Sequence, residues 1–406
     1  MKAGKIDFIP GGTVTSPQGF YAGATYAGIK KQAEPSLDLG ILFSEMPCAT
    51  AGLCTGSRIK SAPVTLCQES LQEGRAVAVV VNSGCANAYT GEQGLADAAE
   101  MAALTAEGIG VSSEDVLVAS TGVTGQPLPM ELIRFGINQI ILSGDGGHEL
   151  AVAIMTTDTV PKETAVAVKA GSNEFTIGGI AKGSGMIHPN LATMFCFLTT
   201  DAAVGLDFLR SALQKAANVS LNMLSIDGDT SPSDTVLLMA NGLAGNEPIT
   251  SGSYQADVFQ QALDQVCIYL AKAIARDGEG ATKLIEVTVN GAMSVAEAKL
   301  AARGVVSSTL VKTAVHGGDP NWGRIIMALG YSGVDVELSK IDLSIGDIGV
   351  LKSSRPLPFS EESIVQILKQ SEVSISVYLN LGTASATAWG CDLSEEYVTI
   401  NSQYMT

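Results

Sequence analysis

The sequence has 406 residues, of which 46% are hydrophobic and 16% charged, with 24 basic and 41 acidic side chains and a net charge of −17. This length provides core for two or three domains or for one large domain, and the composition is that of a folded α/β enzyme, not of a disordered chain. The negative charge argues against nucleic acid or an anionic membrane as the main partner, although it leaves room for a local basic pocket that binds a carboxylate.

Cysteine usage and the chain start predict a cytoplasmic location. The seven cysteines form no Cys-x-x-Cys pair and their number is odd, so no disulfide framework is expected and a reducing compartment fits best. The first ten residues lack the apolar core of a secretion signal, and no stretch has the length and apolarity of a membrane helix. Phosphate-loop, dinucleotide-binding and zinc-binding spacings are also absent from the sequence, so neither a metal nor an organic cofactor is expected.

The first third of the chain is predicted to alternate buried strands with helices. Residues 1–60 are rich in Gly, Thr and Ala and are expected to contain few strands. Short apolar runs predict buried strands at 75–81 and 116–119, each followed by a loop of small residues, a common place for ligands. Alanine-rich and apolar patterns predict a helix over 95–107 that Gly108 closes, and another after Pro127 through about Leu142.

Two segments near residue 150 are also predicted to be extended. Residues 151–160 alternate and are expected to form a strand edge that ends in hydroxyl side chains, and 174–180 read as a strand. The glycine-rich turn at 120–125 can be an anion-binding nest of backbone N–H groups or a plain connection, and the residues alone leave both open.

The stretch from Lys182 to Thr200 suggests an internal self-cleavage site. A glycine-rich lead-in precedes Ala192-Thr193, and an apolar strand-like run follows at once. A turn can hold a strained peptide while the strand holds the threonine hydroxyl against the preceding carbonyl. Attack by Thr193 on Ala192 gives an ester, and its hydrolysis frees a threonine whose own amine can serve as general base. Local composition alone favours the plain interpretation, an ordinary loop followed by a strand.

The second half is predicted to contain long helices and further strands. Helices are expected over 206–223, 253–276, 295–312 and 361–370, and strands over 235–240 and 283–290, with further strands between 334 and 388. The acidic turn 225–234 lacks the later glycine and glutamate of a calcium loop. Residues 316–324 are expected to form a structured loop in which Asp319 and Arg324 have a structural role.

Several blocks resemble the ornithine acetyltransferase family, the glutamate N-acetyltransferases of arginine biosynthesis. The strongest is the processing segment Lys-Gly-Ser-Gly-Met-Ile-His-Pro-Asn-Leu-Ala-Thr-Met, which starts at Lys182. The blocks that begin at Asn82, Ser120 and Gly278 are similar as well. The family usually has Thr-Asn at Gly56-Ser57, where we interpret the difference as variation in a loop, and at Pro232-Ser233, where it leaves the role of the two positions open.

The resemblance implies an α/β fold of the N-terminal-nucleophile type, an α/β sandwich (the aminopeptidase/ornithine-acetyltransferase fold) with a smaller C-terminal α/β domain. The expected domains are 1–282, which bears the nucleophile, and 283–406, whose last residues return to the active site. Cleavage between Ala192 and Thr193 would give mature chains 1–192 and 193–406, assembled as a heterotetramer of two alpha and two beta chains.

The resemblance also implies a ping-pong acetyl transfer from N2-acetylornithine to glutamate, with acetyl-CoA as a substrate only in bifunctional members. Thr193 would be the nucleophile and would carry the acetyl group, and Thr121 and Gly122 would stabilise the oxyanion. The implied substrate contacts are Thr156 (with Thr157 as the second choice), Lys182, Thr193, Glu279, Asn401 and Thr406.

Two rival functions are considered. A self-processing amidase or aminopeptidase would use water as acceptor, but such relatives generally carry serine at the cut, which counts against it. A non-catalytic metabolite-binding protein would never be cleaved.

Overall fold

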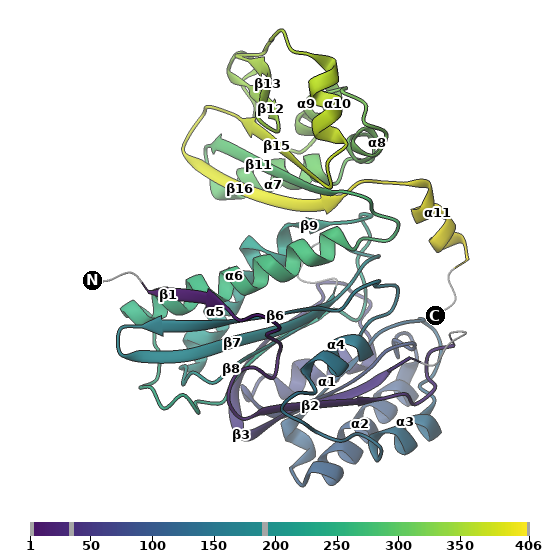
Figure 1. The fold of residues 1–406 in the computed structure, drawn as a ribbon. Helices are drawn as coiled ribbons and strands as arrows, with labels where there is room; N and C mark the ends of the chain where they lie inside the picture. Colours follow the sequence, from purple (N-terminus) through teal and green to yellow (C-terminus); the bar gives the residue numbers. More distant parts are fainter. Residues whose placement is uncertain (1–3, 32–35, 189–193, 404–406) are drawn as a thin grey trace.

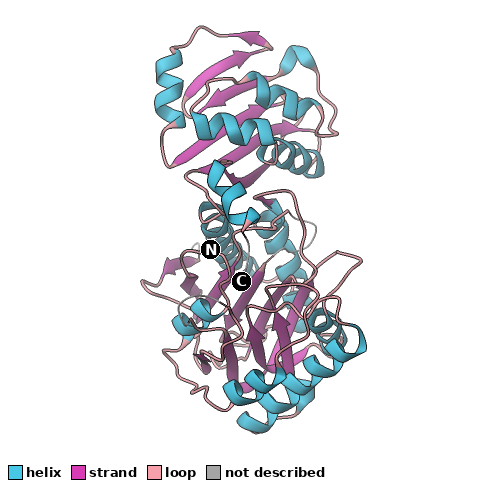
Figure 2. Ribbon diagram, turned by 90° about the vertical axis from the view of Figure 1, so that its right-hand side faces the viewer, coloured by secondary structure: helices cyan, strands magenta, loops and turns pink. Residues whose placement is uncertain are grey.

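The computed structural model describes residues 4–31, 36–188 and 194–403, and folds them into two parts, each built on its own β-sheet (Figure 1). Figure 2 shows these sheets as two separate blocks of strands with helices packed beside them. The predicted α/β class is therefore confirmed. The boundary at residue 282 stays a prediction.

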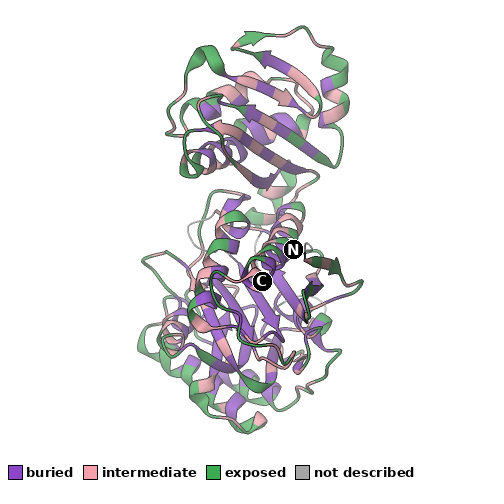
Figure 3. Cartoon of the chain, turned by 90° about the vertical axis from the view of Figure 1, so that its left-hand side faces the viewer, coloured by how far each residue is buried: buried purple, intermediate pink, exposed green. Residues whose placement is uncertain are grey.

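The larger sheet is formed by strands from the first 240 residues. Its order is β1-β6-β7-β8-β10-β3-β4-β5, with β2 paired to β3. Its strands are β1 Lys5–Phe8, β2 Phe20–Thr25, β3 Leu39–Cys54, β4 Arg75–Asn82, β5 Val116–Ser120, β6 Lys162–Ala170, β7 Asn173–Lys182, β8 Phe195–Thr200 and β10 Thr235–Ala240. Figure 3 shows most of these strands as buried. The apolar runs at 75–81 and 116–119 therefore form buried strands, as predicted, with β4 inside the sheet and β5 at its edge.

Helices on the larger sheet fall into two groups. Near β5 lie α1 Ala62–Ser70, α2 Gly91–Ile109 and α3 Met130–Ile137, which pack on one another, while α4 Gly147–Ala153 packs on β2 and β3. On the other side lie α5 Leu206–Val219 and α6 Tyr254–Arg276. Helix α6 contacts β6 and β7 of the larger sheet and β11 and β16 of the smaller one, so it joins the two parts (Figure 1).

The smaller sheet has the order β14-β13-β12-β15-β11-β16-β9. Its strands are β9 Leu224–Ser225, β11 Leu284–Ala292, β12 Asp342–Ile345, β13 Ile348–Lys352, β14 Arg355–Pro356, β15 Glu372–Tyr378 and β16 Ala384–Cys391. Its helices are α7 Val295–Val306, α8 Thr309–Gly317, α9 Gly323–Gly330, α10 Glu361–Leu368 and the C-terminal α11 Glu395–Ser402. Strand β9 precedes α6 in the chain, so this sheet also includes a strand from the segment before residue 282.

Two expectations from the sequence are wrong. Residues 1–60 hold β1, β2 and the 16-residue β3, which lies between β10 and β4 in the sheet and whose small residues Gly40 and Gly52 allow other segments to pack closely on it. At Gly40, for example, a β-carbon would come within van der Waals overlap of the Leu150 side chain. Residues 151–160 are not a strand: they complete α4 and continue as a loop, since Ala151 and Ala153 pack the short helix into the core.

Helix ends also differ from the prediction. Helix α2 runs past Gly108 to Ile109 and ends at Gly110, whose φ of 76° suits a left-handed cap. The helix expected over 295–312 is two helices, because the Ser308 side chain accepts the Val311 N–H and starts α8 anew. Helix α3 stops at Ile137, α5 stops at Val219, and the expected loop 316–324 contains the end of α8 and the start of α9.

Replacing Phe259 with alanine should test the packing of α6. Its side chain is fully buried and its ring lies 5.7 Å from that of Phe175 and 5.8 Å from that of Phe208. Removing it should lower the free energy of unfolding by about 3–5 kcal/mol, measured by chemical denaturation. Tyr269→Ala on the same helix, where the side chain is half exposed, should cost about 1 kcal/mol or less. Equal losses in the two variants would contradict this account of the core.

Candidate functional site

A polar cavity of about 230 Å³ opens where the larger sheet meets the C-terminal helix. The described residues selected first from the sequence line it, and so does Thr157, the second choice: Thr121, Gly122, Thr156, Thr157, Lys182, Glu279 and Asn401. Ala192, Thr193 and Thr406 lie outside the described residues. Met194, the next residue after Thr193, lines the cavity and is buried. Residues from five distant parts of the chain therefore meet around one space.

Thr121 and Gly122 form the turn that follows β5. The Thr121 N–H donates to the Asn82 carbonyl at 3.1 Å, which fixes the turn against the end of the parallel strand β4. Gly122 has a φ of 128°, and a β-carbon there would overlap the Gly84 backbone, so only glycine fits. Within the described ranges, the Thr121 hydroxyl and the Gly122 N–H donate to no protein acceptor. Both donors are thus available to a ligand oxygen in the cavity.

Lys182 ends β7 and brings a cation into the cavity wall. The residue is only 9% exposed, and burial lowers the pKa of its ammonium. Its Nζ donates to the Thr156 hydroxyl at 2.8 Å. No carboxylate of the described chain forms an ion pair with it. A buried ammonium with a hydroxyl as its side-chain partner is well suited to bind a carboxylate.

Glu279 brings a carboxylate to the same cavity. One carboxylate oxygen accepts the Thr157 hydroxyl at 2.7 Å, and the other accepts the Asn401 amide at 2.6 Å. Its N–H donates to the Ser184 carbonyl at 2.7 Å. A β-carbon on Gly185 would collide with the Glu279 carboxylate, so this glycine permits the close approach. Thr156 therefore faces Lys182 and Thr157 faces Glu279, and the choice between them as substrate contact stays a prediction.

Helix α11 carries Asn401 to the cavity by docking on the turn at Gly280. The Ser394 hydroxyl donates to the Gly280 carbonyl at 2.6 Å, just before α11 begins. Gly280 has a φ of 68°, and a β-carbon there would come within 2.5 Å of the Tyr397 backbone nitrogen. This contact brings residues 279 and 401 together although 122 positions separate them. The sequence suggested Asn401 only through the family resemblance.

Asp234 is a cavity residue that the sequence analysis did not select. It is 3% exposed, lines the cavity, and one of its carboxylate oxygens has no hydrogen-bond partner among the described residues. Burial raises its pKa well above the ordinary value, while Ser231 and Lys182 act in the opposite direction. Its position is fixed because the Thr55 N–H donates to its carbonyl and the next N–H, of Thr235, donates to the Met194 carbonyl, both at 3.0 Å. A buried, partly unpaired carboxyl is a common mark of a functional site.

The part of the chain that the structure describes has neither a metal-binding cluster nor a membrane-spanning helix. It holds no cluster of three or more His, Cys, Asp or Glu side chains arranged to bind a metal ion. Among its helices, none combines the length and apolarity required to cross a membrane.

Comparison with known proteins identifies the class first. The α/β fold and polar cavity are those of an enzyme, and the similar proteins are enzymes of arginine biosynthesis. The arginine biosynthesis bifunctional protein ArgJ of Dehalococcoides mccartyi is 51% identical over 401 residues, covering 99% of each chain. That of Symbiobacterium thermophilum is 50% identical over 403 residues, covering 99% of this chain and 100% of the relative.

A solved structure and a family match agree with these relatives. The crystal structure of the bifunctional protein ArgJ from Bacillus halodurans is 49% identical, with a TM-score of 0.50, and covers 52% of this chain and 98% of its own. Residues 21–406 match the ArgJ family. The chain belongs to the ArgJ family.

Changing Asp234 to asparagine should make stability less dependent on pH. Because the pKa of Asp234 is raised in the folded state, its protonated carboxyl contributes stability in full below the pKa of the unfolded chain, about 4. This contribution is lost as the pH rises through the pKa of the folded state. The Asp234→Asn variant cannot ionise, so its melting temperature should rise relative to that of the unchanged protein between pH 4 and 8. A difference in melting temperature that stays constant over this range would contradict the assigned shift.

Proposed function

We propose that this member of the ArgJ family is a glutamate N-acetyltransferase, which moves the acetyl group of N2-acetylornithine to glutamate through an acetyl-threonine at Thr193. The single observation that carries the proposal is the cavity itself. The Thr121 hydroxyl and the Gly122 N–H, which have no acceptor among the described residues, share it with the Lys182 ammonium and with Met194, the neighbour of Thr193 in the chain. Acyl transfer requires donors for an oxyanion next to a nucleophile and a separate anchor for the amino acid.

The first half-reaction forms the acetyl-enzyme. The free α-amine of Thr193 takes the proton of its own hydroxyl while Oγ attacks the acetyl carbonyl of N2-acetylornithine. The Thr121 hydroxyl and the Gly122 N–H donate to the resulting oxyanion. The C–N bond then breaks, the threonine ammonium returns its proton to the leaving nitrogen, and ornithine departs with an amine at that position.

The second half-reaction reverses these roles with glutamate. Its α-amine attacks the acetyl ester, the same donors stabilise the second oxyanion, and the ester C–O bond breaks. One proton of the attacking amine passes through the Thr193 amine to Oγ, which regenerates the hydroxyl. Lys182 holds the α-carboxylate of either substrate, and Glu279, Asn401 and Thr406 complete the amino-acid pocket, as the family resemblance implies.

The N-terminal amine requires cleavage between Ala192 and Thr193. The match to the B. halodurans structure supports this step. It covers 98% of that chain with 52% of this one, about 211 of 406 residues (0.52 × 406). The proposed chains are of that size, with 192 and 214 residues. We further propose that they assemble as two alpha and two beta chains.

Acetyl-CoA is proposed as a second acetyl donor, because the relatives carry the name bifunctional. It would acetylate Thr193 in place of N2-acetylornithine, with the thiol of coenzyme A as leaving group. A rate assay with glutamate as acceptor distinguishes the donors directly.

Replacing Thr193 with alanine should abolish both cleavage and transfer. Without the hydroxyl, neither the ester needed for cleavage nor the acetyl-enzyme can form. A denaturing gel should show one band in place of two, and acetylglutamate formation should be undetectable. Thr199→Ala, in β8 and outside the cavity lining, is the control that retains both reactions. A cleaved and active Thr193→Ala protein would refute the nucleophile.

Replacing Thr121 with alanine should lower kcat by roughly a hundredfold, the usual effect of removing one oxyanion donor. The KM for glutamate should change much less, because the donor acts on charge that exists only in the transition state. Steady-state kinetics with both substrates make this measurement. Thr124→Ala is the matched control, because it removes a threonine hydroxyl of the same turn that is not assigned to the oxyanion. Its kcat should stay close to that of the unchanged enzyme. Equal kcat values for the Thr121→Ala and unchanged enzymes would remove Thr121 from this role.

A further inference from the structure

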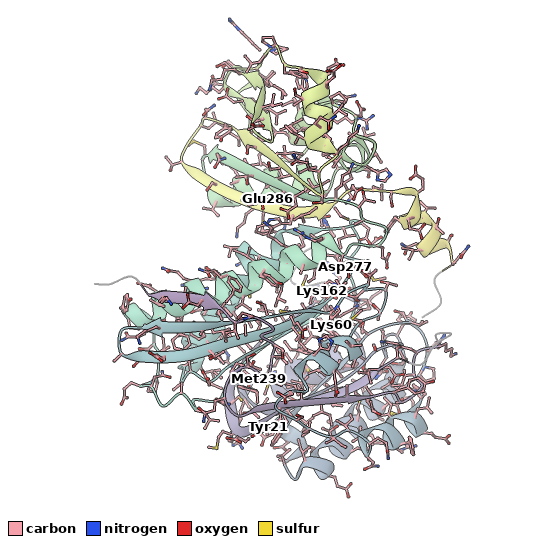
Figure 4. All side chains as sticks on the ribbon, viewed as in Figure 1. Tyr21, Lys60, Lys162, Met239, Asp277 and Glu286 are labelled. Carbon is pink, nitrogen blue, oxygen red and sulfur yellow. The ribbon has the colours of Figure 1, made fainter. Side chains whose placement is uncertain are left out.

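A buried ion network lies behind the cavity wall, outside the residues that the proposed mechanism uses. Lys162, near the start of β6, has a side chain that is 1% exposed. Its Nζ pairs with Asp158 at 2.7 Å and with Asp277 at 2.6 Å, and those side chains are 0% and 7% exposed. Figure 4 shows Lys162 and Asp277 next to one another where the two parts of the fold meet. The sequence analysis selected none of the three residues.

The two aspartates tie together the segments that carry the predicted substrate contacts. Asp158 accepts the Gly183 N–H at 2.6 Å and the Thr156 N–H at 3.0 Å. It therefore holds the end of β7 beside the loop that contains Thr156. Asp277 accepts the Thr159 N–H at 3.0 Å and lies two residues before Glu279. Lys162 thus forms ion pairs with both aspartates that hold these segments in place.

The charges of two lysines, Lys162 and Lys182, act on the carboxylate of Asp158. Burial alone would raise the pKa of Asp158, but the Lys182 and Lys162 charges outweigh burial and lower it to about 2. The carboxylate is therefore ionised and attracts both ammonium groups. Only Lys162 forms the ion pair, whereas Lys182 turns to the Thr156 hydroxyl at the cavity.

We propose that Lys162 is a positioning residue for substrate binding: by occupying Asp158 and Asp277, it leaves the Lys182 ammonium free to bind the α-carboxylate of the amino-acid substrates. Without Lys162, the buried Asp158 carboxylate would lose its ion-pair partner while the Lys182 charge still acts on it, and an uncompensated buried charge is costly. Lys182 would then pair with Asp158 and withdraw from the cavity. This inference rests on the proposed function, because it concerns how that site recognises glutamate and N2-acetylornithine.

The test is the Lys162→Met variant, assayed with both substrates. The KM for glutamate and for N2-acetylornithine should each rise by about tenfold or more, the usual loss for one charge-assisted bond, while kcat stays within about threefold. Lys162→Arg should restore most of the loss. Lys162→Met combined with Lys182→Met should be no worse than Lys182→Met alone, since both act through one contact. Lys169→Met, an exposed lysine on the same strand, is the matched control.

An acetyl donor that has no carboxylate tests whether Lys162 has a purely structural role, because such a donor does not need the Lys182 ammonium. Acetylation of Thr193 by p-nitrophenyl acetate, followed by intact mass, should proceed at the unchanged rate in Lys162→Met. If the methionine variant fails to accumulate as folded protein, Lys162→Gln takes its place in the same assays. Unchanged KM values, or a parallel fall in p-nitrophenyl acetate reactivity, would overturn the inference. Failure of the proposed function is separate, because the unchanged protein would then transfer no acetyl group to glutamate.

Discussion

A cation buried beside the cavity is the constraint around which this site is organised. Burial lowers the pKa of Lys182 and makes its charge costly, so nearby carboxylates must offset that cost without neutralising the lysine completely. The network of Asp158, Lys162 and Asp277 provides this balance from behind the wall. Because the same carboxylates accept backbone N–H groups, the charge balance and the shape of the cavity depend on one set of contacts.

Glycine determines how closely the walls of the cavity approach each other. The turn at Gly122 lies against the Gly84 backbone, Gly185 lies against the Glu279 carboxylate, and Gly280 receives the C-terminal helix. In any other residue, a β-carbon at these positions would overlap the neighbouring segment. The motifs that carry the family resemblance are therefore also the places where separate segments touch, which explains why chemistry and packing coincide in them.

Strands and long helices were predictable because their signals are local. The strand 235–240 and the helix that ends at Arg276 were predicted within one residue, since apolar periodicity and a serine cap suffice to define them. Strand β3 was missed because its small residues are explained only by the neighbours on its two faces. The cavity residues needed the family resemblance: nothing local distinguishes Thr121 or Glu279 from an ordinary loop residue. Asp234 and Lys162 escaped even that, because their importance arises from burial and from partners distant in sequence.

The central claim is that Thr193 carries the acetyl group on a hydroxyl activated by its own amine. The most direct measurement is intact-mass and peptide mapping of protein mixed with N2-acetylornithine in the absence of glutamate. The account predicts a chain that begins at Thr193 and gains the mass of one acetyl group, located on the Thr193 side chain and lost when glutamate is added. An acetyl group on another residue, or an active protein that is a single unbroken chain, would contradict it.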